Sequence, residues 1–165
     1  MKKQKGFSLI ELLIVVAIIL IIAAIAIPNL LRSRMAANEA SAVGSIRSIT
    51  TAEMTYNAAY PDIGYSALLA NLGGTQASCT PPVVATSTNA CVIDYLLSSG
   101  SKSGYTFTAV GTIIGGGTIN NAFTSTGVPQ GIGSTGQRGF GSDQTGVVRY
   151  TTSGVVPVTG SSALQ

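Results

Sequence analysis

The chain has 165 residues, which is enough for one domain of ordinary size. Its formal charge of +3 comes largely from Lys2, Lys3 and Lys5, because the remaining six basic residues equal the six acids in number. The chain beyond Lys5 is therefore formally neutral, which gives no electrostatic reason to expect a nucleic-acid partner. The sequence also lacks histidine, the most frequent general base of enzymes.

The first element is an apolar segment directly behind these lysines. Residues 12–27 carry no charged or hydrogen-bonding side chain, and residues 7–27 carry one charge, Glu11. As a helix with a rise of about 1.5 Å per residue, residues 7–27 extend roughly 30 Å, the thickness of bilayer hydrocarbon. Basic residues before such a segment favour a cytoplasmic N-terminus, with the rest of the chain on the other side of the membrane.

A secretory signal peptide is the alternative interpretation of this segment. Such a peptide has a shorter apolar core and ends at a small-residue cleavage site, which the Ala-rich residues 23–26 could supply. Glu11 argues against it, because a carboxylate within an apolar segment is costly in lipid and usually marks a specific partner.

Residues 5–28 (KGFSLIELLIVVAIILIIAAIAIP) resemble the type III signal and N-terminal helix of type IV pilins and pseudopilins. The resemblance implies cleavage after Gly6 by a prepilin peptidase and N-methylation of the new N-terminal residue, Phe7. It also implies that Glu11 pairs with the N-terminal amine of a neighbouring subunit and that Pro28 kinks the helix.

Physical chemistry supports a special role for Glu11 independently. In a bundle of apolar helices a lone carboxylate must be neutralised or paired, and an amine on Phe7 of a neighbour about one turn away would pair with it. The alternative is that Glu11 reaches the headgroup zone of the membrane.

A second helical stretch follows Pro28 and is expected over residues 28–56. Proline removes one backbone donor and kinks a helix without necessarily ending it. The apolar positions recur at helical spacing and predict one buried stripe. They are Leu31, Met35, Ala42, Ile46, Ile49 and Tyr56.

Cys79 and Cys91 are the only cysteines. They follow the apolar segment, on the side of the membrane where disulfides persist. The pair predicts one disulfide that closes the loop 77–91, with two free thiols as the alternative. Two thiolates without histidine make a metal site less plausible, and no covalently bound haem is expected. Asp143 is the only acid after Asp94, so no calcium site and no other cofactor is expected.

The C-terminal part is expected to form a β-sheet over about residues 104–152. Loop signals, with one short helix at 66–72, precede it, and residues 91–97 fit a short helix or a strand. Alternation at 105–110 predicts a strand, 119–126 a weaker one, and 127–136 an irregular segment. Residues 138–152 are expected to form a hairpin, in which 139–150 resemble a recurrent hairpin of pilin-like proteins, and 154–165 a loose tail.

The expected fold is therefore α+β, with a long N-terminal helix packed on an antiparallel sheet. We expect a leader (1–6), a membrane and filament-core helix (7–27), and a periplasmic or extracellular domain (28–165). The resemblance implies a structural filament subunit that polymerises with itself and needs an inner-membrane assembly platform with its ATPase. It implies a single-pass precursor in the bacterial inner membrane, which then enters an extracellular or periplasmic filament.

Two other functions stay open at this stage. One is a pseudopilin of a type II secretion system, which shares the N-terminal motif. The other is a monomeric binding domain tethered to the membrane, which would need neither cleavage nor Glu11. An enzyme is not expected, because no pair of acids, nucleophile with a base, or phosphate-binding loop is evident.

Overall fold

The computed structural model describes residues 7–75, 79–80, 84–155 and 162–164. The chain divides into two compact units, Met1–Arg34 and Met35–Gln165, here called the first and second units. One helix, α1 (Leu9–Ala59), contributes to both.

Helix α1 has 51 residues and contains Pro28 in its interior. It therefore continues through the proline, as expected, and extends beyond Tyr56 to Ala59. Pro61 follows two positions later. A proline disfavours helical backbone at the residue before it, here Tyr60, which explains why the helix ends at Ala59.

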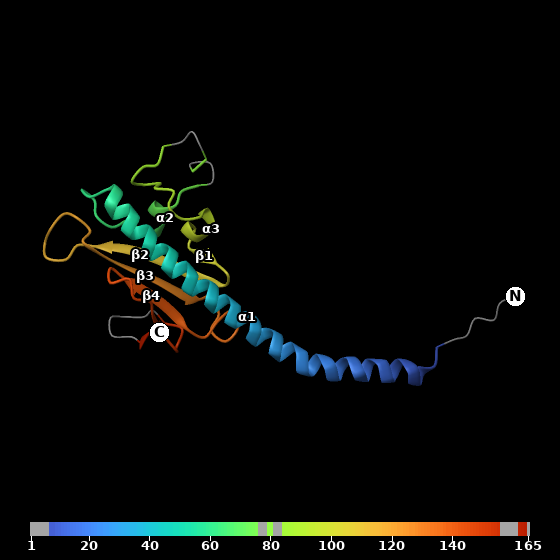
Figure 1. The fold of residues 1–165 in the computed structure, drawn as a ribbon. Helices are drawn as coiled ribbons and strands as arrows, with labels where there is room; N and C mark the ends of the chain where they lie inside the picture. The colour runs from blue at the N-terminus through green and yellow to red at the C-terminus, as the bar shows by residue number, and fades with distance from the viewer. Residues whose placement is uncertain (1–6, 76–78, 81–83, 156–161, 165) are drawn as a thin grey trace. The chain divides into compact units, whose positions relative to one another are not determined.

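Six strands form one sheet in which every neighbouring pair is antiparallel and the order follows the sequence. They are β1 (Ser101–Lys102), β2 (Tyr105–Thr112), β3 (Ala122–Pro129), β4 (Gly139–Asp143), β5 (Arg149–Thr151) and β6 (Ser162–Ala163). The longest pairing joins β2 to β3, from Tyr105 opposite Pro129 to Thr112 opposite Ala122. Figure 1 shows the part of α1 that belongs to the second unit, residues 35–59, lying across one face of this sheet.

The strands extend further than the sequence indicated. Residues 127–129, expected to be irregular, belong to β3, and β6 lies in the segment expected to be a loose tail. Gly127 explains the first error: a Cβ there would come within 2.8 Å of the Phe107 ring. This glycine admits an aromatic neighbour and does not end the strand.

The core of the second unit joins α1 to β2 and β4. Ala42, Ile46, Ile49, Ala52 and Tyr56 lie on the buried face of α1. Opposite them are Tyr105, Phe107 and Ala109, which alternate along β2, together with Phe140 of β4. Leu31, expected on the same stripe, is instead exposed and belongs to the first unit, so the expected stripe began too early.

Two short helices lie between α1 and the sheet in the sequence. Helix α2 (Leu69–Leu72) buries Leu69 and Leu72, and α3 (Tyr95–Ser98) buries Leu97. Residues 91–97 are thus partly helical and not a strand. Asp94 starts α3, because its carboxylate accepts a hydrogen bond from the Leu97 amide at 2.9 Å.

Candidate functional site

The first unit presents an almost unbroken apolar surface. The large apolar side chains from Phe7 to Leu31 are all exposed, and none of the most apolar window of α1 is buried. Among the described residues, α1 is the one helix long and apolar enough to cross a membrane. Exposed apolar surface of this extent marks a contact with lipid or with other protein.

Glu11 caps the start of α1 in a single copy of the chain. Its carboxylate accepts a hydrogen bond from the Ser8 amide at 2.8 Å. Ser8 directly precedes the helix and Glu11 is its third residue, which is half of a capping box. The S-x-x-E pattern at 8–11 is the sequence signal for this cap, and our sequence interpretation overlooked it. Thus Glu11 is hydrogen-bonded locally and remains exposed.

The sequence-predicted site residues fall in two places. Phe7, Glu11 and Pro28 belong to the first unit, and Gly6 lies outside the described residues. Cys79 and Cys91 form the predicted disulfide in the second unit, with their Cα atoms 5.5 Å apart.

Hydrogen bonds hold the disulfide loop against the neighbouring α2 segment and α1. The Cys91 amide donates to the Gly73 carbonyl at 3.0 Å, and the Val92 amide donates to the Leu72 carbonyl at 2.8 Å. The Tyr56 hydroxyl of α1 donates to the Ser87 carbonyl at 2.7 Å. Residues 76–78 and 81–83 of this segment lie outside the described residues.

Glu39 of α1 binds the start of β4 through four contacts. Its carboxylate accepts hydrogen bonds from the amides of Gln137 at 2.8 Å and Arg138 at 3.1 Å, and from Arg138 Nε at 2.8 Å. Arg138 Nη2 lies 2.8 Å from the same carboxylate. The guanidinium stacks over Phe140 at 5.5 Å and over Tyr150 at 5.7 Å.

This arrangement shifts two pKa values. Burial tends to raise the pKa of Glu39, but the hydrogen bonds from Gln137 and Arg138 and the charge of Arg138 outweigh it and lower that pKa. Burial, followed by the nearby charge of Glu39, raises the pKa of Tyr105 to about 12, despite the opposing effect of Arg138. Tyr105 therefore stays neutral and donates its hydroxyl to the Arg138 carbonyl at 2.9 Å.

Glu53 is a second buried carboxylate of α1, and it forms no ion pair with any cation among the described residues. The Ser66 amide donates to it at 2.8 Å and the Ser66 hydroxyl at 2.6 Å. Burial raises the pKa of Glu53, and the two hydrogen bonds from Ser66 only partly oppose that rise. Glu53 thereby holds the segment after α1 against the helix.

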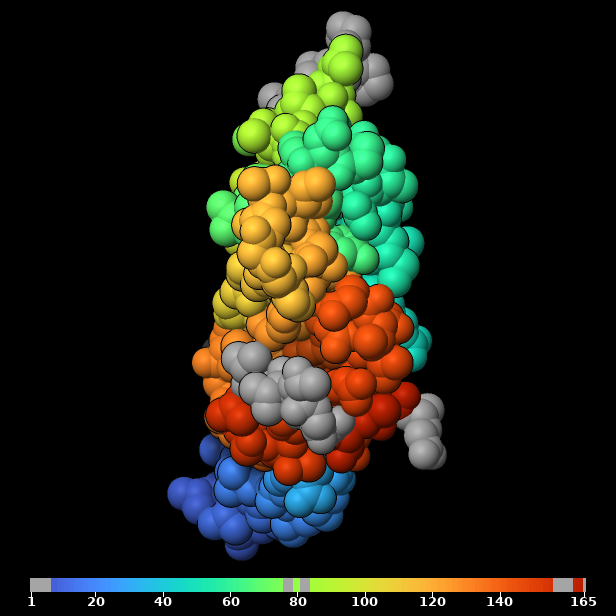
Figure 2. Space-filling view, turned by 90° about the vertical axis from the view of Figure 1, so that its left-hand side faces the viewer, coloured from blue at the N-terminus to red at the C-terminus, as the bar shows by residue number. Residues whose placement is uncertain are grey.

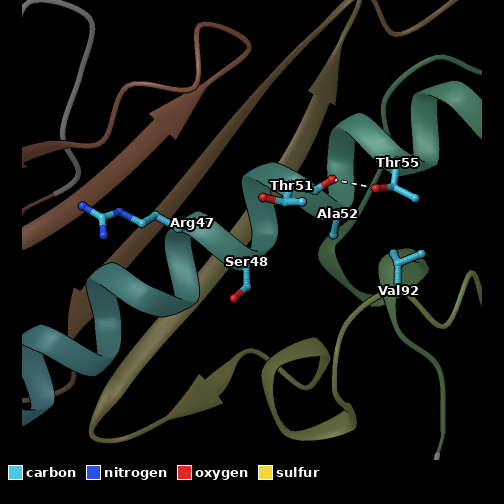
Figure 3. Close-up of a pocket in the computed structure, with 6 residues that line it drawn as sticks. All are labelled: Arg47, Ser48, Thr51, Ala52, Thr55 and Val92. Atoms are coloured by element: carbon cyan, nitrogen blue, oxygen red, sulfur yellow. Dashed lines mark hydrogen bonds between the residues drawn. The ribbon is translucent and has the colours of Figure 1, made fainter.

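An open groove of about 470 Å³ lies beside α1. Its lining is formed by Arg47, Ser48, Thr51, Ala52, Thr55 and Val92 (Figure 3). Ser48 donates its hydroxyl to the Gly44 carbonyl, and Thr55 donates to the Thr51 carbonyl, both at 3.0 Å. The described residues contain no group of three or more metal-ligating side chains.

Sequence analysis missed two separate pairs, Glu39 with Arg138 and Glu53 with Ser66. Each acid falls on the helical face that also carries the apolar stripe, which was the available signal. Their partners could not be found from spacing, because Glu39 and Arg138 are 99 positions apart.

Comparison with known proteins gives consistent matches. Residues 1–27 match the family described as the prokaryotic N-terminal methylation motif. The chain is 34% identical over 128 residues to the type IV wide pilus major component PilA4 of Thermus thermophilus, which covers 76% of this chain and 95% of that protein.

Two further relatives match shorter parts. The type IV major pilin protein PilA of Myxococcus xanthus is 43% identical over 54 residues, 33% of this chain and 24% of that protein. The type II secretion system core protein G of Vibrio cholerae is 39% identical over 74 residues, 42% of this chain and 51% of that protein. No solved structure gives a significant match.

Proposed function

Because the chain belongs to the type IV pilin family, we propose that it is a structural subunit of a type IV pilus-like filament, made first as a single-pass precursor in the inner membrane. The observation that carries the proposal is the exposed apolar surface of the first unit, continuous from Phe7 to Leu31. That surface is accommodated either in lipid or among copies of itself, and its burial drives assembly.

Processing of the N-terminus is part of the proposal. A prepilin peptidase cleaves after Gly6, Phe7 is N-methylated, and an assembly platform with its ATPase moves the subunit from the membrane into the fibre. Mass spectrometry of protein from sheared fibres is expected to give methylated Phe7 as the first residue. An N-terminus at Met1 in that material would contradict the processing step.

Glu11 is proposed to gain a second partner on assembly. In a single copy the Ser8 amide satisfies the carboxylate, and in the fibre the Phe7 amine of a neighbour adds a cationic partner. A charged hydrogen bond of this kind is about twice as strong as a neutral one, so it would fix the stagger between helices.

The test compares Glu11→Gln with wild type. Glutamine keeps an oxygen for the Ser8 amide but removes the charge, so the variant should insert in the membrane normally and assemble poorly. Normal fibre yield from Glu11→Gln would exclude pairing with the amine, whereas Glu11→Ala would also remove the cap and is the less specific change.

A pseudopilin of a type II secretion system is the second candidate. The match to the Vibrio cholerae core protein supports it, but that match covers 42% of this chain, whereas the match to the Thermus thermophilus pilus component covers 76%. Deletion of the chain distinguishes them: loss of surface fibres with normal protein secretion supports the pilus, and the reverse supports the pseudopilus.

A further inference from the structure

The end of the second unit beyond Thr112 of β2 carries a group of exposed isoleucines. We call the isoleucine ridge the set Ile63, Ile113, Ile114 and Ile119. Figure 2 looks onto this end, where the loop between β2 and β3 lies next to the end of α1. Four exposed isoleucines in one place are unusual for a surface that meets only water.

The ridge is built on a fixed backbone. Asn121 accepts the Ile114 amide at 2.7 Å and donates to the Ile114 carbonyl at 2.8 Å. The Asn120 amide donates to the Ile63 carbonyl at 3.0 Å, which joins the two segments of the ridge. Gly115 and Gly116 have positive φ values of 86° and 79°, and a side chain there would meet nothing within 4 Å. The backbone of the ridge is therefore held by hydrogen bonds, and the neighbouring glycines carry no side chains that would cover it.

The groove on α1 is lined by two apolar and four polar residues. Ala52 is buried, and Val92 adds a second apolar side chain. The hydroxyl hydrogens of Ser48 and Thr55 are already donated to carbonyls of their own helix. An apolar side chain entering the groove therefore leaves these two donors satisfied.

The charges beside the ridge and the groove are complementary. Asp62 is exposed directly before Ile63, and Arg47 is exposed in the groove lining. Within the part of the chain that the structure describes, the ion pairs are Lys102 with Asp94 and Arg138 with Glu39, so neither Asp62 nor Arg47 has an opposite charge in its own copy.

We propose that the isoleucine ridge of one copy docks in the α1 groove of a second copy, with Asp62 facing Arg47 across the contact. The two surfaces lie on different parts of the second unit, so the contact is heterologous, and in the proposed fibre it repeats from copy to copy along an open helix. The inference rests on the chain's assembly into a fibre and identifies a contact between second units in addition to the apolar helices.

Cross-linking in intact fibres tests the contact directly. Full-length protein carrying Ile114→Cys and Thr51→Cys, assembled in cells and oxidised, should give a ladder of covalent multimers on a non-reducing gel. Each single variant should give no ladder, and Gln144→Cys with Thr51→Cys is the matched control. Normal fibres without a ladder would overturn the docking but leave the filament function intact, whereas absence of wild-type fibres would contradict the function itself.

Charge exchange supplies an independent test. Arg47→Asp and Asp62→Arg should each lower the yield of sheared fibres about tenfold, because each places like charges together. The double variant should restore most of that yield, with the processed subunit present in the membrane in all cases. A double variant as poor as the singles would contradict the pairing.

An apolar control separates docking from general solubility. Ile114 and Ile132 are equally exposed, at 61% each, but Ile132 is outside the ridge. Ile114→Ser should lower fibre yield and Ile132→Ser should not. If Ile114→Ser leaves the yield unchanged and instead weakens binding of fibres to phospholipid vesicles, the ridge contacts lipid and the proposal is wrong.

Discussion

Glu39 and Glu53, two buried acids on one face of α1, have opposite pH responses. For Glu39, whose pKa is lowered, the contribution to stability is present above the ordinary value of 4.5 and is lost as pH falls through the folded-state pKa. For Glu53, whose pKa is raised, the contribution is present below 4.5 and is lost as pH rises through the folded-state pKa. The difference follows from the partner, which is a cation in one case and a serine in the other.

Glu53→Gln is therefore expected to raise the free energy of unfolding above the folded-state pKa of Glu53 and to match wild type in acid. An amide oxygen still accepts from the Ser66 amide, and no charge remains to desolvate. Denaturant titration of the fragment 28–165 across pH measures this. Glu53→Ala is the contrast: it leaves the buried Ser66 amide without an acceptor and should cost about 1–3 kcal/mol at every pH.

At the scale of elements, the disulfide between Cys79 and Cys91 closes a loop between α2 and α3. Replacing both Cys79 and Cys91 by serine is expected to lower the free energy of unfolding by about 3 kcal/mol in the chain-entropy model. The check is denaturation of the double variant against wild type with and without reductant. Reductant should lower wild-type stability toward that of the variant and leave the variant unchanged.

Substitutions at two glycines, Gly127 of β3 and Gly44 of α1, should change the free energy of unfolding in opposite directions. Gly127→Val places a Cβ 2.8 Å from the Phe107 ring and should destabilise by about 1–3 kcal/mol. Gly44 is an exposed residue in the middle of α1, and a Cβ added there would meet nothing within 4 Å. Gly44→Ala should therefore stabilise the fold by about 0.5–1 kcal/mol. Thermal melting of both variants of the fragment 28–165 distinguishes them, and a stabilising Gly127→Val would contradict the packing described for β3.

At the scale of the whole molecule, removal of residues 7–27 should leave a soluble monomer, because the largest exposed apolar surface is gone. Analytical centrifugation of the fragment 28–165 measures this. Fibres formed by the fragment alone would show that the apolar helix is not needed for assembly.

Local sequence patterns were sufficient to predict α1, the disulfide and the strand pattern at 105–110. Each depends on residues close in the chain: helical spacing, two cysteines without competitors, and alternation along β2. The end of β3, β6 and the Glu39–Arg138 pair were not predictable in this way. They depend on which distant residue becomes a neighbour, such as Phe107 beside Gly127.

The long separation between Glu39 and Arg138 also constrains the order in which the chain folds as it is synthesised. Glu39 emerges early in synthesis, whereas Arg138 follows 99 positions later. By then β2 has emerged and covers the face bearing Ala42, Ile46 and Ile49, so the contact with β4 is the one still missing. Docking of β4 on α1 is consequently among the last folding events, and a chain halted before residue 138 leaves the Glu39 carboxylate without its cation.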